Sequence, residues 1–265
     1  MRCLASVCVS ALVLLAATQS GAAGFDHSYR AYDQLLQRHV NSAGMVNYEA
    51  LSRDKRLPGF LQEIGALTPE EVESWSRDQQ VAFYINAYNA ITLQTIVEAM
   101  PVSTIRDIQP DPWEETKWLV AGRKVSLNFL EHNRLRKHLK EVRVHFVLVC
   151  AAMGCPRLPN RAVVPVNLDS ALNRWTAAFV QDSTRNRVDR EGGNVHLSRI
   201  FEWYSSDFVG LGGVADSLAF EGLSPKAAGV LRYIYRFLAP EQRAVLDAGR
   251  VTVMYSEYDW SLNSQ

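Results

Sequence analysis

Apolar and polar residues recur along this chain with mostly helical spacing. The longest such pattern covers 78–100 and stops at Pro101, because the residue before a proline disfavours helical geometry. Other helices are predicted where apolar residues recur every three or four positions, or where a capping residue precedes a proline. They cover 26–40, 126–139 and 168–180, and start after Thr68, Ser198, Ser224 and Ala239, the last ending before Gly249.

Strand patterns are short and few. Alternating apolar positions favour strands over 142–150 and 251–258, a hairpin over 118–125 and a short strand over 195–197. The glycine-rich stretch 210–213 has no strand before it and is interpreted as a loop. Helices come first and then mix irregularly with strands, without a βαβ repeat. This order predicts an α+β fold, a helix-rich single domain with a small, mostly antiparallel sheet.

The first 23 residues have the pattern of a signal peptide. Arg2 precedes an uncharged apolar run over 4–17, and small residues follow, with Gly21 and Ala23 at the −3 and −1 positions. The apolar run is shorter than the roughly 20 residues that span a membrane. We therefore expect 1–23 to be removed and 24–265 to form one exported globular domain, periplasmic or extracellular. No integral membrane segment is expected after signal removal.

The charge balance narrows the class of partner. The chain has 28 Lys and Arg against 28 Asp and Glu, whereas nucleic acids and anionic membranes require a basic surface. We expect no nucleic-acid partner, no cofactor, and an unidentified small-molecule or peptide ligand. Cys3 and Cys8 would leave with the signal, so Cys150 and Cys155 remain. In an oxidising compartment they could form a disulfide, or one could be a reactive thiol.

The stretch 144–156 reads VHFVLVCAAMGCP and is the first candidate site. A predicted strand delivers Cys150, a possible nucleophile if His145 acts as its base. On a regular strand these two side chains lie on opposite faces. Either the strand bulges, or Cys155 is the partner, or the residues are a buried cysteine and a core histidine. A metal site formed with His132 matches no trusted zinc spacing, and none is predicted.

Three further polar residues fall on apolar helix faces. Asn86 and Asn89 lie in the middle of the helix 78–100, where buried amides need partners. They could hold a loop by its backbone or line a pocket. Glu131 lies on the apolar face of the helix 126–139. A histidine or arginine could pair with it, as a structural ion pair or within a site.

Several stretches together resemble the domain of unknown function 547 family, as a secreted bacterial-type member. They occur in the family's order and extend over nearly all of 24–265. They are 80–93 (QVAFYINAYNAITL), 103–108 (STIRDI), 126–132 (SLNFLEH), 145–150 (HFVLVC) with 154–156 (GCP), 201–204 (FEWY) with 207–208 (DF), and 258–263 (YDWSLN).

The resemblance implies which polar residues matter. The family's recurring positions match Asn86, Asn89, Glu131, His145 and Cys150. The first cysteine is the firmer of the two, which favours Cys150 as the nucleophile, and Gly154 stands where the family has serine. A cysteine, a histidine and a carboxylate or amide are similar to the catalytic set of papain-like or transglutaminase-like enzymes, by analogy.

Two hypotheses result. The first is a thiol-dependent hydrolase or acyltransferase acting on amide or thioester bonds. The second is a non-catalytic binding domain that uses the same polar pocket. The residues predicted to be catalytic are Cys150, His145 and Glu131, and those predicted to bind substrate are Asn86, Asn89 and Cys155.

Overall fold

A computed structural model describes residues 24–189, 192–211 and 217–265. The expected signal peptide, 1–23, and residues 212–213 of the glycine-rich stretch lie outside the described residues. Within the described part, none of the helices combines the length and apolar character that a membrane crossing requires.

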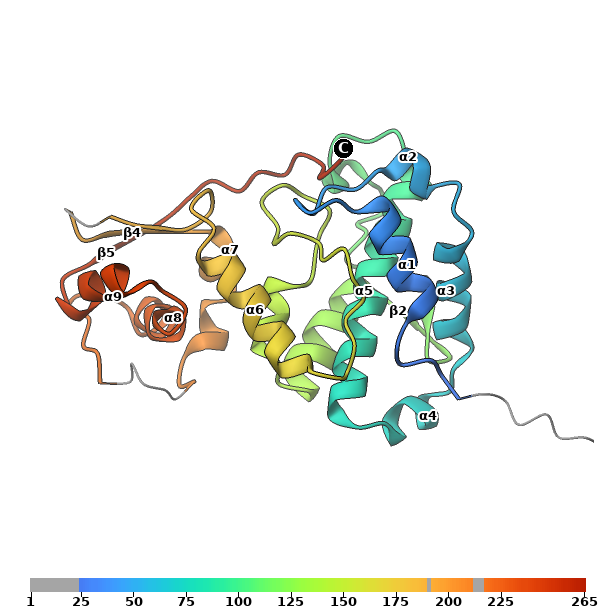
Figure 1. Cartoon of the computed structure of the whole chain (residues 1–265), viewed down its shortest axis with the longest axis horizontal. Coiled ribbons are helices and arrows are strands. Elements are labelled where there is room, and N and C mark those ends of the chain that lie inside the picture. The colour runs from blue at the N-terminus through green and yellow to red at the C-terminus, as the bar shows by residue number, and fades with distance from the viewer. Residues whose placement is uncertain (1–23, 190–191, 212–216) are drawn as a thin grey trace, which may run out of the picture.

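The N-terminal half is built around one long buried helix, α5 (Arg77–Ala99). Every side chain from Val81 to Leu93 is buried. The helix starts with a capping box between Ser76 and Gln79. Short helices pack around it (Figure 1), namely α1 (Arg30–His39), α2 (Tyr48–Leu51), α3 (Arg56–Ala66) and α4 (Pro69–Ser74).

The predicted hairpin and the helix after it are both present. Strands β1 (Trp118–Val120) and β2 (Arg123–Val125) pair antiparallel. The following helix, η2 (Phe129–His138), is a π-helix, and the Ser126 hydroxyl accepts from the N–H of Phe129 at its start. A short 3-10 turn, η1 (Ile105–Asp107), lies between α5 and the hairpin.

The C-terminal half has its own hydrophobic cluster around Phe146, Phe201 and Phe208. A three-stranded sheet has the order β3-β4-β5, in which β3–β4 is antiparallel and β4–β5 is parallel. The elements are α6 (Leu168–Val180), β3 (Arg187–Val188), β4 (Asn194–Leu197), α7 (Arg199–Trp203), η4 (Ser205–Phe208), α8 (Pro225–Tyr235), α9 (Pro240–Asp247) and β5 (Thr252–Tyr255). The helix-rich α+β fold with small sheets is therefore confirmed.

The predicted strand over 142–150 is wrong. Residues Val142–Phe146 form a 3-10 helix, η3, and an irregular segment follows. Alternation predicts a strand with one buried and one exposed face, but Val144, His145, Phe146 and Val147 are all buried. A segment enclosed on all sides needs partners for its backbone rather than an alternating face. The side chain of Asn89 supplies two of those partners, as described below.

The C-terminal segment returns to the N-terminal half. After β5 it runs across the molecule to α2 (Figure 1). Ser264 bridges to Val46, and the Tyr48 hydroxyl donates to the Asn263 side chain at 2.7 Å. The backbone N–H of Leu262 donates to Ser103. This segment therefore joins the two halves and passes the pocket described next.

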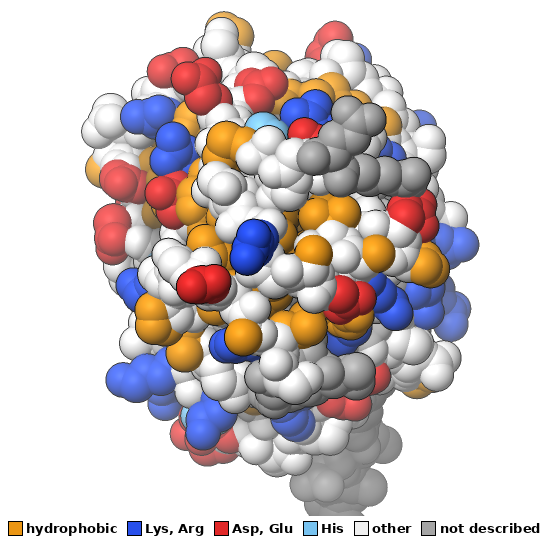
Figure 2. Space-filling model, turned by 90° about the vertical axis from the view of Figure 1, so that its left-hand side faces the viewer, with side chains coloured by type: hydrophobic (Ala, Val, Ile, Leu, Met, Phe, Trp, Pro, Cys, Tyr) orange, Lys and Arg blue, Asp and Glu red, His pale blue; other side chains and the backbone are white. Residues whose placement is uncertain are grey.

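Charges are mixed on the surface. On the end of the molecule opposite α3, acidic and basic side chains are interspersed, with hydrophobic side chains scattered between them (Figure 2). The view shows no broad patch of one sign, as expected for a chain whose formal net charge is +0.

Candidate functional site

A pocket of about 380 Å³ lies where the two halves meet. Its walls come from α5, η2, the segment around residue 150, α7 and the C-terminal segment. Six aromatic side chains line it, namely Tyr88, Trp113, Trp203, Tyr204, Tyr258 and Trp260. The polar lining consists of Asp111, Asn128, Glu131, His145, Cys150 and Cys155.

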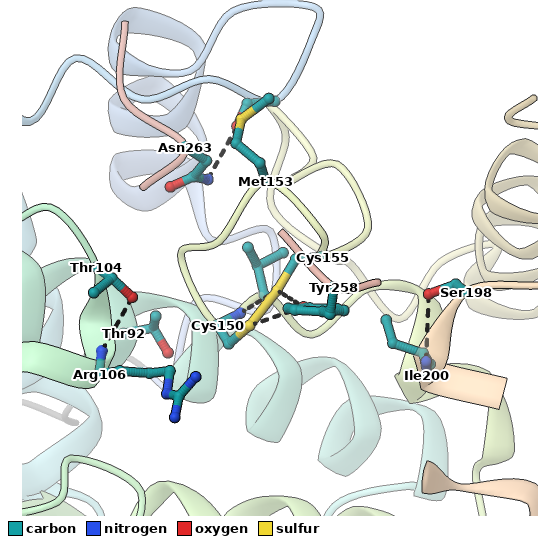
Figure 3. The surroundings of a disulfide bond; sticks show 12 residues. Thr92, Thr104, Arg106, Cys150, Met153, Cys155, Ser198, Ile200, Tyr258 and Asn263 are labelled. Atoms are coloured by element: carbon teal, nitrogen blue, oxygen red, sulfur yellow. Dashed lines mark hydrogen bonds between the residues drawn. A yellow bond between two sulfur atoms is a disulfide. The ribbon is translucent and has the colours of Figure 1, made fainter. Parts of the chain in front are cut away.

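A disulfide between Cys150 and Cys155 forms one wall (Figure 3). The Tyr258 hydroxyl lies 3.2 Å from the sulfur of Cys150 and 3.0 Å from that of Cys155. Disulfide sulfurs carry no hydrogen, so Tyr258 is the donor to both. The N–H of Cys150 also donates to the Cys155 sulfur at 2.9 Å. Cys155 is buried and Cys150 is half-buried, so Cys150 is the more accessible sulfur.

Gly154 makes room for the Tyr258 ring. A Cβ on Gly154 would lie 2.8 Å from Cε2 of that ring, closer than such contacts occur. The serine that the family resemblance leads us to expect at this position would therefore displace the ring from the disulfide. The glycine and the close approach of Tyr258 belong together.

The carboxylate of Asp207 holds His145 through its Nε2. Its Nε2 lies 2.8 Å from Oδ2 of Asp207, and its ring stacks on Tyr204 with centroids 3.9 Å apart. Burial lowers the pKa of His145 from its ordinary value of 6.5, and outweighs the hydrogen bond to Asp207, which favours the charged ring. Because the carboxylate accepts, the neutral ring carries its proton on Nε2, and Nδ1 has the lone pair of a base.

Arg136 holds the other side of Asp207. Its Nε and Nη2 donate to the two carboxylate oxygens at 2.6 and 2.8 Å, and the same guanidinium contacts His132 Nδ1. Burial raises the pKa of Asp207, but the hydrogen bonds from His145 and Arg136 outweigh it and hold that pKa well below the ordinary 3.8. Asp207 is therefore an anion fixed between a base and a guanidinium.

Glu131 is a buried carboxylate with an unused oxygen. Its side chain is 7% exposed, and Oε1 has no hydrogen-bond partner among the described residues. The contact to His132 Nδ1, at 3.8 Å, is longer than a hydrogen bond. The expected structural ion pair is thus reduced to a distant contact. Burial raises the pKa of the neighbouring Tyr204, and the charge of Glu131 and a side-chain hydrogen bond to Glu131 raise it further. Only Oε1 of Glu131 is therefore without a partner among the described residues.

Asn86 and Asn89 hold loops by their backbones. The Asn89 amide donates to Val147 O and accepts from Val149 N, both at 3.0 Å. Asn86 makes the same pair of bonds with the N–H and C=O of Val163, at 2.9 and 2.7 Å. Each side chain thus pairs with both backbone groups as a neighbouring strand would. The prediction that they are buried and hydrogen-bonded is confirmed.

The structure brings some of the predicted site residues together and not others. Cys150, Cys155, His145 and Glu131 all line the pocket, whereas Asn86 and Asn89 are not among its lining residues. Their predicted substrate contacts remain a prediction. Within the described residues, no group of three His, Cys, Asp or Glu side chains is placed to hold a metal ion.

Sequence reasoning missed the residues that complete the site. Asp207 is hydrogen-bonded to His145, and Tyr258 contacts both sulfurs. Both lie far along the chain from residues 145–155, so no local pattern connects them. Both residues fall inside stretches that carry the family resemblance, Asp207 in DF and Tyr258 in YDWSLN, and that resemblance was the signal that could have found them.

The fold and site describe a helix-rich α+β protein with a disulfide-bearing aromatic pocket. Comparison with known families identifies the segment 72–180, which matches the family described as protein of unknown function, DUF547. The expected resemblance to this family is therefore confirmed over these residues. The matched range includes the two cysteines, His145 and Glu131, but ends before Asp207 and Tyr258. Searches of curated proteins and of solved structures found no match.

Proposed function

We propose that this protein is an exported, thiol-dependent hydrolase or acyltransferase that acts on amide or thioester bonds once the Cys150–Cys155 disulfide is reduced. One observation carries the proposal. Cys150 and His145 line the same pocket, and His145 is oriented through Nε2 by a fixed carboxylate. That arrangement leaves Nδ1 as the basic nitrogen, and a nucleophile, a base and an orienting group are what thiol catalysis requires.

The proposed reaction starts with reduction. An external dithiol supplies two electrons and two protons, is itself oxidised to a disulfide, and converts the Cys150–Cys155 disulfide into two thiols. His145 Nδ1 takes the proton of Cys150, and the thiolate attacks the substrate carbonyl carbon. The tetrahedral intermediate expels an amine or a thiol, which receives the proton from His145, and a thioester to Cys150 remains. Water or an acceptor amine then cleaves that thioester and restores the thiol.

Export supports the same proposal. The pattern of 1–23 predicts a signal peptide, and disulfides persist in oxidising compartments. A closed disulfide would keep the nucleophile inactive there until a reductant arrives. N-terminal sequencing of protein recovered from the periplasm or medium should begin near Gly24, and an intact Met1 would contradict export and the secreted bacterial-type assignment.

The test is labelling of the reduced, folded protein with iodoacetamide at pH 6–7, followed by mapping of the modified cysteine. We expect Cys150 to react at least about tenfold faster than an unperturbed thiol, because transfer of its proton to His145 Nδ1 produces the thiolate. His145→Ala should slow the reaction, whereas His138→Ala, at an exposed position, should not. Circular dichroism verifies that each reduced variant is folded.

The alternative is a non-catalytic binding domain. The aromatic pocket and the closed disulfide are compatible with a site that only binds. Slow labelling of Cys150 in reduced, folded protein, unchanged by His145→Ala, would reject the enzyme and favour this alternative.

A further inference from the structure

The unused oxygen of Glu131 is the strongest unexplained feature of the pocket. A buried carboxylate without a partner is costly, because it loses hydration and gains nothing in return. Native proteins retain such groups where a ligand, an ion or a bound water supplies the missing partner, or where the group has a catalytic role. Oε1 of Glu131 is buried and unpartnered among the described residues, and the side chain lines the pocket.

The walls around Glu131 are aromatic. Tyr88 and Tyr204 both sense its charge, which adds to burial in raising their pKa values. Trp203 on α7 packs against Tyr258 and Trp260 on the C-terminal segment, and these two also pack against each other. The ring centroids are 4.6 to 5.9 Å apart. The negative faces of aromatic rings attract cations, most strongly where water is excluded.

The charges around the pocket leave it negative. Its lining contains Asp111 and Glu131 but, among the described residues, no Lys or Arg. The lowered pKa of His145 keeps that ring neutral near pH 7. The two carboxylates therefore give the lining a formal charge of −2.

The arginines around the pocket are already engaged. Arg136 is held by both oxygens of Asp207, and Arg185 pairs with Asp182 at 2.7 Å. Arg106 is exposed and lies over the Trp260 ring at 5.2 Å. It shows that this aromatic wall already attracts a guanidinium, although none reaches Glu131 Oε1.

We infer that the pocket binds an organic cation, the ammonium or guanidinium group of a lysine-like or arginine-like side chain, with Glu131 as its counter-ion. A donor N–H of that group would bond to the Glu131 carboxylate where the side chain lines the pocket, and the aromatic walls would surround its charge. What this inference implies about the substrate rests on the proposed function. The substrate would carry a positive charge close to the bond that Cys150 attacks.

The test measures binding without catalysis, on the oxidised protein. Nα-acetyl-lysine N-methylamide and its neutral analogue Nα-acetyl-norleucine N-methylamide are titrated by calorimetry, with tryptophan fluorescence as a second readout. Nα-acetyl-arginine N-methylamide is titrated in the same way and distinguishes a guanidinium from an ammonium. We expect the norleucine compound to bind at least about tenfold more weakly than the better of the two cations, since it lacks the ion pair and the cation–π contacts. This comparison needs no variant.

A matched pair of variants then assigns the preference. Glu131→Gln should reduce the difference between cation and norleucine to about twofold or less, because the amide keeps the size but removes the charge. Glu98→Gln, on an exposed residue that pairs with Lys117 outside the pocket, should leave the difference unchanged.

Each outcome decides the inference. Equal binding of the cationic and neutral compounds overturns it, as does no binding of either. A cation preference that survives Glu131→Gln overturns the assigned counter-ion. Because the disulfide stays closed in these titrations, an unreactive Cys150 in the labelling test would reject the enzyme without affecting this result.

Discussion

The two asparagines on α5 and the carboxylate on η2 are all buried polar groups, yet they are partnered very differently. Asn86 and Asn89 each use both the nitrogen and the oxygen of the amide on the backbone of adjacent loops. Glu131 leaves one oxygen without a partner among the described residues. A fully paired buried group stabilises the fold, whereas an unpaired one is retained at the expense of stability. The first region behaves as structure and the second as a site.

The largest effect is expected from breaking an asparagine clamp. Asn89→Ala leaves the C=O of Val147 and the N–H of Val149 without their partner, which should lower the free energy of unfolding by about 3 kcal/mol. Urea denaturation monitored by circular dichroism measures it. Asn133→Ala, at an exposed position on η2, is the control and should change stability little. If Asn89→Ala and Asn133→Ala are equally stable, Asn89 does not stabilise the fold, and the contrast between the asparagines on α5 and Glu131 is lost.

Removal of the disulfide should have the next largest effect. The bond joins residues five positions apart, and closing so short a loop restricts the unfolded chain by about 2 kcal/mol. Cys155→Ser and chemical reduction should both lower the free energy of unfolding by this amount and leave a folded protein. If reduction unfolds the protein instead, a reducible resting state is untenable.

The third prediction concerns acid. The unfolded chain binds a proton on His145 near pH 6.5, whereas the folded chain binds it only at lower pH, because burial lowers the pKa of His145. His145 therefore contributes fully to the free energy of unfolding above pH 6.5, and this contribution declines as the pH falls toward the folded pKa. The loss is about 1.4 kcal/mol for each unit by which folding lowers the pKa of His145. His145→Gln should flatten the dependence of unfolding free energy on pH in this range, and His138→Gln should not. Asp207 adds a further loss below its ordinary pKa of 3.8.

The smallest effect has the opposite sign. Glu131→Gln removes a buried charge whose Oε1 is unpaired, so the free energy of unfolding should rise by about 0.5–1 kcal/mol, as is common when a functional site is replaced. Thermal denaturation near pH 7 measures it. A clear loss of stability would place Glu131 with the asparagines as a structural residue.

Much of the fold could be predicted from local patterns. The capping residues Thr68, Ser198 and Ser224 each accept a backbone hydrogen bond at the helix start that they predicted. These signals operate within one turn of helix and depend on few neighbours. The predicted bounds of α6, 168–180, agree with the structure because its apolar residues recur at helical spacing along one buried face.

The segment 142–150 could not be predicted in this way. Its alternation is real, but burial on all sides comes from α6, η2 and the aromatic cluster around Phe146. A side chain from 58 residues earlier, Asn89, replaces the neighbouring strand. Tertiary contacts of this kind override local strand preference.

The candidate site was half predictable for a related reason. Cys150, Cys155, His145 and Glu131 occur within a span of 25 residues in the chain, from 131 to 155. The groups that fix their chemistry, Asp207 and Tyr258, arrive from 62 and 108 residues away. Spacing along a sequence carries no information on contacts at such separations unless the topology is known.

The C-terminal segment has a consequence for how the chain acquires its shape. Val46 pairs with Ser264, and Tyr258 and Trp260 supply part of the pocket wall. Contacts between such distant residues close large loops, which slows folding. During synthesis, the helices around α5 emerge while the pocket still lacks its Tyr258 side. An oxidant present at that stage would reach the cysteines before Tyr258 can contact their sulfurs, so pairing of Cys150 with Cys155 is free to precede completion of the pocket.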